Sequence, residues 1–196
     1  TVEHTPLQAE ALGLKHYLLS CDVADPKKEA AIVEKFVAKK QKSAAERVEA
    51  VILGGTGLQA TQIRSLQDAL RPYAIDVFAA HSGFDHLNVL KQMINDGYEI
   101  LITQVAGEGL PNWLGKTITK ENVDELARDA EKYGFHVGGE GGSYDSLVTD
   151  APTFRKKIVV EEMEKVMEDA YSGHVVIKKL RLVGKVMRKS ALSAVN

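Results

Sequence analysis

Residues 138–154 read GGEGGSYDSLVTDAPTF, and no other stretch says as much about how the chain folds. Four glycines surround one carboxylate, that of Glu140. Glycine has no Cβ, so its backbone can take positive φ or approach a ligand closely. The residues that follow alternate in character and end at an Asp-Ala-Pro turn. The pattern predicts a loop that leads into a strand, a common place for function, with an ordinary surface turn as the alternative.

Before this stretch, short apolar runs alternate with amphipathic segments, which is typical of βαβ units around a parallel sheet. We expect buried strands at 16–21, 50–53, 76–80 and 99–105. We expect helices at 5–14, 26–42, 58–70, 85–95 and 120–133, the first with Thr5 as its N-cap and Gly13 at its end. After residue 150 the pattern indicates a hairpin or a small antiparallel extension.

The predicted fold is therefore α/β: a Rossmann-like parallel sheet with a small β-rich extension at the C-terminal end. We place the nucleotide-binding part at residues 1–135, and the glycine-rich loop with the extension at 136–196. In an open α/β sheet, ligands bind outside the carboxyl ends of the strands. Three glycine-bearing loops, at 54–57, 107–109 and 138–142, are expected there. Together they predict a nucleotide-sized cleft.

Composition excludes several classes of protein. The 196 residues suffice for one domain with a real core, and the formal net charge of −2 gives no argument for nucleic-acid binding. The single cysteine, Cys21, cannot form an internal disulfide and fits a reducing compartment. Because we see neither a membrane-spanning run nor a signal peptide, we expect a cytoplasmic protein without a membrane partner.

Four blocks of sequence, in a fixed order, point to a known family. They are LQAEALG at 7–13, GYEILI at 97–102, VAGEGL at 105–110 with Trp113 just after it, and GEGG at 139–142 with Asp150, Pro152 and Phe154. Over residues 5–185 the chain resembles the ATP-dependent diphthine–ammonia ligase family. This family is a branch of the PP-loop superfamily, the N-type ATP pyrophosphatases.

The resemblance implies a reaction, a set of small molecules and a protein partner. Family members use ATP to activate the carboxylate of diphthine, a modified histidine on translation elongation factor 2. Ammonia then displaces AMP from the acyl-adenylate, and diphthamide, AMP and pyrophosphate result. We accordingly expect ATP, Mg²⁺ and ammonium as the small molecules and elongation factor 2 as the protein substrate, and a homodimer is left open.

The resemblance also implies roles for individual residues. We assign the catalytic carboxylate to Glu140. Contacts with the nucleotide are assigned to Gly54, Gly55, Glu108 and Gly109. Contacts with the substrate are assigned to Gly139, Gly141, Gly142, Tyr144 and Trp113. No residue is assigned to a metal, and the scattered histidines, His136 among them, are assigned to structure. A turn glutamate that holds backbone N–H groups is the alternative for Glu140, and a loop anchor is the alternative for Trp113.

The sequence also departs from the family pattern. The phosphate loop of the superfamily, Ser-Gly-Gly-x-Asp-Ser, does not occur in it. Ala60 and Thr61 stand where the family has tyrosine and glutamine. We therefore expect the first strand and the phosphate loop to be missing, and this chain alone not to hydrolyse ATP. Two other hypotheses stay open: a non-catalytic paralogue that acts as a binding module, and a PP-loop ATP pyrophosphatase with another substrate.

Overall fold

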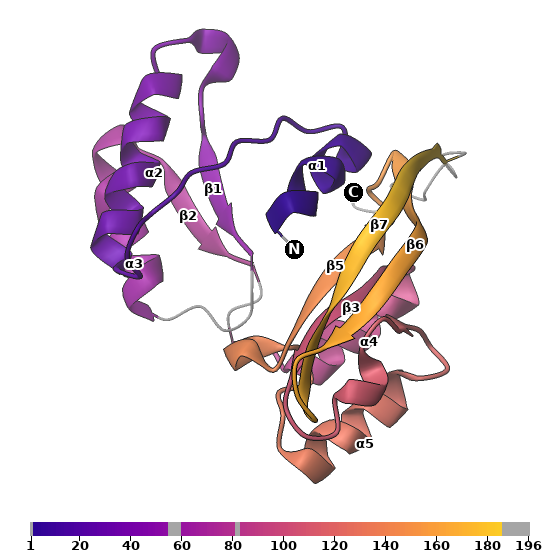
Figure 1. Cartoon of the computed structure of the whole chain (residues 1–196). Coiled ribbons are helices and arrows are strands. Elements are labelled where there is room, and N and C mark those ends of the chain that lie inside the picture. Colours follow the sequence, from indigo (N-terminus) through magenta and orange to yellow (C-terminus); the bar gives the residue numbers. More distant parts are fainter. Residues whose placement is uncertain (1, 55–59, 81–82, 186–196) are drawn as a thin grey trace, which may run out of the picture. The chain divides into compact units, whose positions relative to one another are not determined.

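The computed structural model of the chain describes residues 2–54, 60–80 and 83–185 (Figure 1). The chain divides into two compact units, one made of Thr1–His16 with Leu87–Asn196 and the other of Tyr17–His86. This division differs from the predicted boundary at residue 135. The reason is strand pairing: β3 (Glu99–Ala106) precedes that boundary but pairs with β5 (Tyr144–Asp150) and β7 (Ser172–Gly184), which follow it.

The smaller unit contains one βαβ motif and a preceding helix. Its elements are α2 (Pro26–Lys40), η2 (Ala44–Glu46), β1 (Ala50–Leu53), α3 (Ala60–Leu70), η3 (Arg71–Tyr73) and β2 (Asp76–Ala79). The Asp25 side chain caps α2 by accepting from the backbone N–H groups of Lys27 and Lys28 at 3.0 and 2.9 Å. β1 and β2 are parallel and in register from Ala50↔Asp76 to Leu53↔Ala79, as the alternating pattern predicts.

The strands of the smaller unit are half-exposed rather than buried. Val51 and Val77 pack against a core of Val37, Leu70 and Ile75 on one face. On the other face, the register partners Ile52 and Phe78 are 71% and 53% exposed. The prediction of fully buried strands is therefore wrong here. It is also wrong for residues 16–21, which form no strand and are exposed.

The larger unit is built on an antiparallel sheet. Its helices are η1 (Val2–His4), α1 (Thr5–Leu12), α4 (His86–Asp96), η4 (Pro111–Trp113), α5 (Val123–Tyr133) and η5 (Glu140–Gly142). Besides β3, β5 and β7, its strands are β4 (Thr117–Ile118) and β6 (Lys156–Met167). β6 and β7 pair from Lys156↔Gly184 to Met167↔Gly173, which confirms the predicted hairpin.

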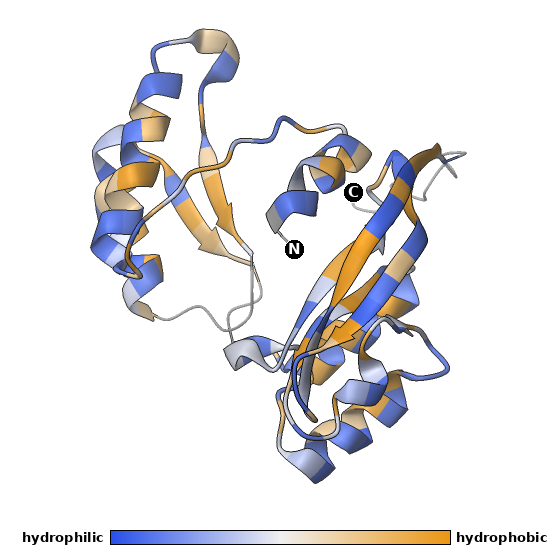
Figure 2. Ribbon diagram, viewed as in Figure 1, coloured by the Kyte–Doolittle hydropathy of each residue, from blue (hydrophilic) through white to orange (hydrophobic). Residues whose placement is uncertain are grey.

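β3 is the central strand of the larger unit. It pairs antiparallel with β4, β5 and β7, so the expectation that it joins a parallel sheet is wrong, although the α/β class is confirmed. Ile102 and Val105 of β3 are fully buried beside Leu126 of α5 and Trp113 of η4. Figure 2 shows hydrophobic residues along β7, whereas hydrophilic ones predominate on α5.

The first sequence block and the last one meet in a second core. Ala11 of α1 is fully buried against Ala151, Phe154 and Ile158, and the Arg155 N–H donates to the Ala11 carbonyl at 2.7 Å. α1 starts one residue earlier than predicted, because Thr5 is its first helical residue and His4 takes the N-cap position, while Gly13 caps its C-terminus with φ 72°. None of the described helices combines the length and the apolar character needed to cross a membrane.

Candidate functional site

The glycine-rich loop before β5 is organised around one histidine. His136 Nδ1 accepts from the backbone N–H groups of Gly138 and Glu140 at 3.1 and 3.2 Å. The His136 carbonyl accepts from the Gly139 N–H at 2.9 Å. Three successive amides thus donate to a single residue, and the loop closes into η5. The predicted loop leading into a strand is confirmed.

Gly139 is the position in this loop where a side chain could not fit. Its φ is +78°, and an added Cβ would lie 2.7 Å from the Tyr144 carbonyl oxygen. L-residues pay about 1–2 kcal/mol for the left-handed conformation alone, and the carbonyl leaves no room besides. Gly141 and Gly142 also have positive φ, but the space around their Cβ positions is open.

Tyr144 fixes the far end of the loop. It is buried, and its hydroxyl donates to the Val137 carbonyl at 2.6 Å. Burial raises the pKa of this phenol, and the nearby carboxylate of Glu140 raises it further. Glu140, half-buried, therefore has its charge close to the Tyr144 ring. Its backbone carbonyl also accepts from the Ser143 hydroxyl at 3.4 Å.

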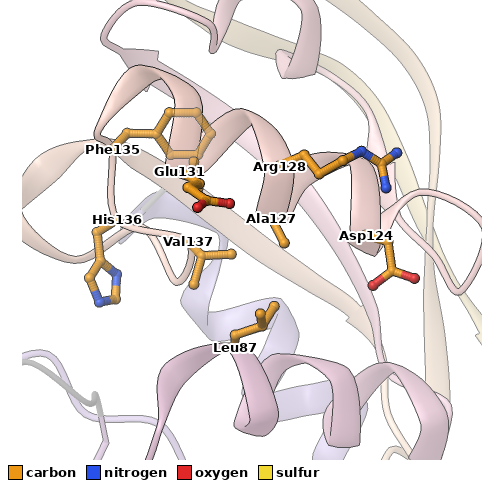
Figure 3. Close-up of a pocket in the computed structure, with 9 residues that line it drawn as sticks. Leu87, Asp124, Ala127, Arg128, Glu131, Phe135, His136 and Val137 are labelled. Carbon is orange, nitrogen blue, oxygen red and sulfur yellow. The ribbon is translucent and has the colours of Figure 1, made fainter.

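A cleft of about 500 Å³ opens beside the loop, within the size range of ligand sites. α5 contributes Asp124, Ala127, Arg128 and Glu131, and the segment leading to the loop contributes Phe135, His136 and Val137. Figure 3 shows Leu87 reaching from α4 toward Val137 and Ala127. Because His136 both lines the cleft and holds the glycine loop, cleft and loop form one candidate site.

Charges of both signs border the cleft. Lys91 on α4 pairs with Asp124 on α5 at 2.7 Å, and this pair joins the two helices. The hydrogen bond from Lys91, together with its charge, holds the pKa of Asp124 below its usual range. Glu131 and Arg128 are exposed on the same helix. An apolar floor with charged groups at the rim suits a ligand that carries both a charge and an alkyl part.

Trp113 and Gly109 have structural roles. Trp113 is 1% exposed, and its indole Nε1–H donates to Asp129 Oδ2 on α5 at 2.9 Å, so the alternative of a loop anchor fits it. A Cβ on Gly109 would meet the Tyr133 ring at 2.2 Å. A hydrogen bond with the Tyr133 hydroxyl is the main cause that raises the pKa of Lys132, and the charge of the exposed Glu108 contributes least. The predicted ligand contacts of these three residues stay predictions.

The remaining predicted nucleotide contacts belong to the smaller unit. Gly54 follows β1, and an added Cβ there would meet nothing within 4 Å. Gly55 lies outside the described residues. Within the ranges that the structure describes, no group of three histidine, cysteine or acidic side chains could hold a metal ion. The described residues therefore do not fit a protein-built magnesium cage, and phosphates would have to supply much of the coordination.

Sequence reasoning missed the cleft and the role of His136. One signal was available: Asp124, Arg128 and Glu131 are spaced by four and three residues, which places them on one face of a helix. That helix ends at Gly134, just before the glycine loop. No local pattern shows that Nδ1 of a histidine accepts from amides two and four residues later.

Comparisons with known proteins point to the same family as the four sequence blocks. Residues 85–183, which include the loop and the cleft, match the family model described as diphthamide synthase C-terminal domain. Over 85 residues the chain is 42% identical to the mouse protein named diphthine--ammonia ligase, covering 42% of this chain and 32% of that one. The human protein of that name is 39% identical over the same coverage.

A more distant relative shows the same partial coverage. The Schizosaccharomyces pombe protein named diphthine--ammonia ligase is 36% identical over 98 residues, half of this chain and 16% of the relative. Against the mouse and human proteins, the match spans about a third of the relative's length.

Proposed function

The chain belongs to the diphthamide synthase family, and on that premise we propose that it takes part in the amidation of the diphthine carboxylate on elongation factor 2. The observation that carries this proposal is the family match across residues 85–183, the stretch that contains the Glu140 loop and the cleft. ATP supplies the adenylyl group that makes a carboxylate a good acyl donor.

We assign the acceptor half of the reaction to this chain. The cleft lined by α5 and Phe135 receives the diphthine side chain, and Glu140 stands at the loop next to it. Ammonium has no free electron pair, so it must lose a proton before nitrogen attacks the activated carbonyl. Glu140 accepts that proton. Gly139 allows the close backbone turn that brings the carboxylate there.

The assay uses the product of the complete reading frame that encodes this chain, incubated with diphthine-bearing elongation factor 2, ATP, Mg²⁺ and ammonium. AMP release and conversion of carboxyl to amide, read by mass spectrometry, should both occur. Glu140→Gln should lower the rate at least about a hundredfold, the usual contribution of a proton acceptor. Glu161→Gln, at a β6 carboxylate that pairs with Lys179 and Arg181, is the matched control and should retain activity. Full activity of the Glu140 variant would remove that residue from the reaction.

A second candidate is a binding module without catalysis, because the glycine loop and the cleft both lie in the matched stretch, residues 85–183. Such a protein would bind diphthine-bearing elongation factor 2 through the Glu140 loop and release no AMP. Binding measured by calorimetry, with the unmodified factor as control, separates the two candidates. Binding without AMP release supports the module, whereas ammonium-dependent AMP release supports the ligase.

A further inference from the structure

Resting on the proposed function, we propose that His136 is the positioning residue of the Glu140 loop and that it acts through Nδ1 rather than through Nε2. The loop consists largely of glycine, the residue that loses most conformational freedom on folding. A loop of this kind keeps one conformation only when other groups hold its backbone.

The hydrogen bonds identify the group that holds it. The amides of Gly138 and Glu140 both donate to the same ring nitrogen, and the amide between them donates to the carbonyl of the same residue. An imidazole nitrogen that accepts hydrogen bonds carries no proton, so the neutral ring has its proton on Nε2. The hydrogen bond thereby fixes the backbone nitrogen of Glu140, which is two covalent bonds from the Cβ atom of the Glu140 side chain.

The second contact of His136 explains why a histidine is suited to this place. His136 is also one of the residues that line the cleft, next to Val137 (Figure 3). The same residue therefore borders the region where we place the substrate and holds the backbone that carries the proposed proton acceptor. A ligand that shifts the ring would also move the loop, because the amides of Gly138 and Glu140 both donate to Nδ1.

Substitution of His136 by asparagine or by glutamine distinguishes the role of Nδ1 from that of Nε2. Asparagine places its Oδ1 acceptor at the same distance from Cβ as Nδ1, whereas the polar atoms of glutamine lie one bond farther out, near the place of Nε2. His136→Asn should preserve the loop, and His136→Gln should loosen it. His136→Leu removes both nitrogens. His174→Asn, on the exposed end of β7, controls for the loss of an imidazole elsewhere.

The first measurement is amide hydrogen exchange by NMR on this chain, which needs no activity. In His136→Gln and His136→Leu, exchange at Gly138 and Glu140 should rise about fivefold, the ratio that the loss of one net hydrogen bond gives. His136→Asn and the His174 control should match the wild type. Wild-type exchange at both amides in His136→Gln and His136→Leu, or loss of protection in His136→Asn alone, would overturn the proposal.

The second measurement uses the amidation assay. His136→Gln should lower kcat at least about tenfold with little change in KM, since a displaced acceptor impairs proton transfer more than binding, and His136→Asn should restore kcat. If exchange responds as expected while Glu140→Gln stays fully active, His136 still holds the loop and the proposed role of Glu140 fails. If kcat falls equally in the Asn and Gln variants, the ring acts in another way and the Nδ1 assignment is wrong.

Discussion

β3 and β1 look alike as sequence and differ as structure. Both are apolar runs, EILITQVA and AVIL, and both are strands. β3 has strands on both edges and buries nearly every side chain from Ile100 to Val105. Among the described residues, β1 pairs with β2 alone, and Ile52 stays 71% exposed. Composition selects a strand in each case, but the number of neighbours decides how much apolar area leaves the water.

Two isoleucines differ most in burial between the two strands. Ile102, in β3, is fully buried, and Ile52, in β1, is largely exposed. Ile102→Ala should lower the free energy of unfolding by about 2–5 kcal/mol through lost burial and a cavity. Ile52→Ala should change it by less than about 0.5 kcal/mol. Urea denaturation followed by fluorescence of Trp113 and by circular dichroism measures both, and equal effects would mean that β1 is covered in solution.

Much of the fold could be predicted from local signals. Gly13 and Gly134 end their helices as expected, because a left-handed residue closes the last turn. Strand direction could not be predicted, because a continuous apolar run such as residues 99–105 is typical of parallel strands, and only pairing with β5 and β7 makes β3 antiparallel. HYLLSC at 16–21 has an apolar pattern but is exposed, since pattern alone does not supply a partner strand.

The candidate site was predictable where backbone geometry demands glycine. The loop at 138–142 and its position before a strand follow from composition, and Gly139 has both positive φ and a crowded Cβ position. The partners of the loop were not predictable. Tyr144 and Trp113 are both buried and hydrogen-bonded inside the protein, and their predicted contacts with the substrate stay predictions. Local sequence reports residue type and spacing but not which side chains are buried.

The contrast between crowded and open surroundings recurs within the glycine loop. Gly139→Ala meets both unfavourable φ and the Tyr144 carbonyl, whereas Gly141→Ala, with φ +73° and open space, meets unfavourable φ alone. The second variant should lose about 1–2 kcal/mol of stability, and the first should lose more. Thermal unfolding measures the difference. If Gly141→Ala were the more damaging change, crowding at Gly139 would not be what fixes the loop.

Two tyrosines, one in each unit, donate hydrogen bonds of different length. Tyr144→Phe, in the larger unit, leaves the Val137 carbonyl without its 2.6 Å donor and should cost about 1 kcal/mol. Tyr73→Phe, in the smaller unit, removes a 3.4 Å contact with Glu34 and should cost less. Both free energies come from the same denaturation series. A larger loss for Tyr73→Phe would show that the shorter hydrogen bond of Tyr144 is not the stronger one.

The smallest expected effect concerns the ion pair between α4 and α5. Lys91 lowers the pKa of Asp124, so folding is favoured by this pair above the pKa of an unfolded aspartate, and the contribution disappears as the pH falls through the lower, folded value. Because the pair is exposed, the effect is slight and screened by salt. Asp124→Asn should therefore unfold at a slightly lower temperature than the wild type at neutral pH and low salt. The two proteins should converge both in acid and in high salt. A gap that persists in acid would show that the aspartate supports the helices by a contact other than its charge.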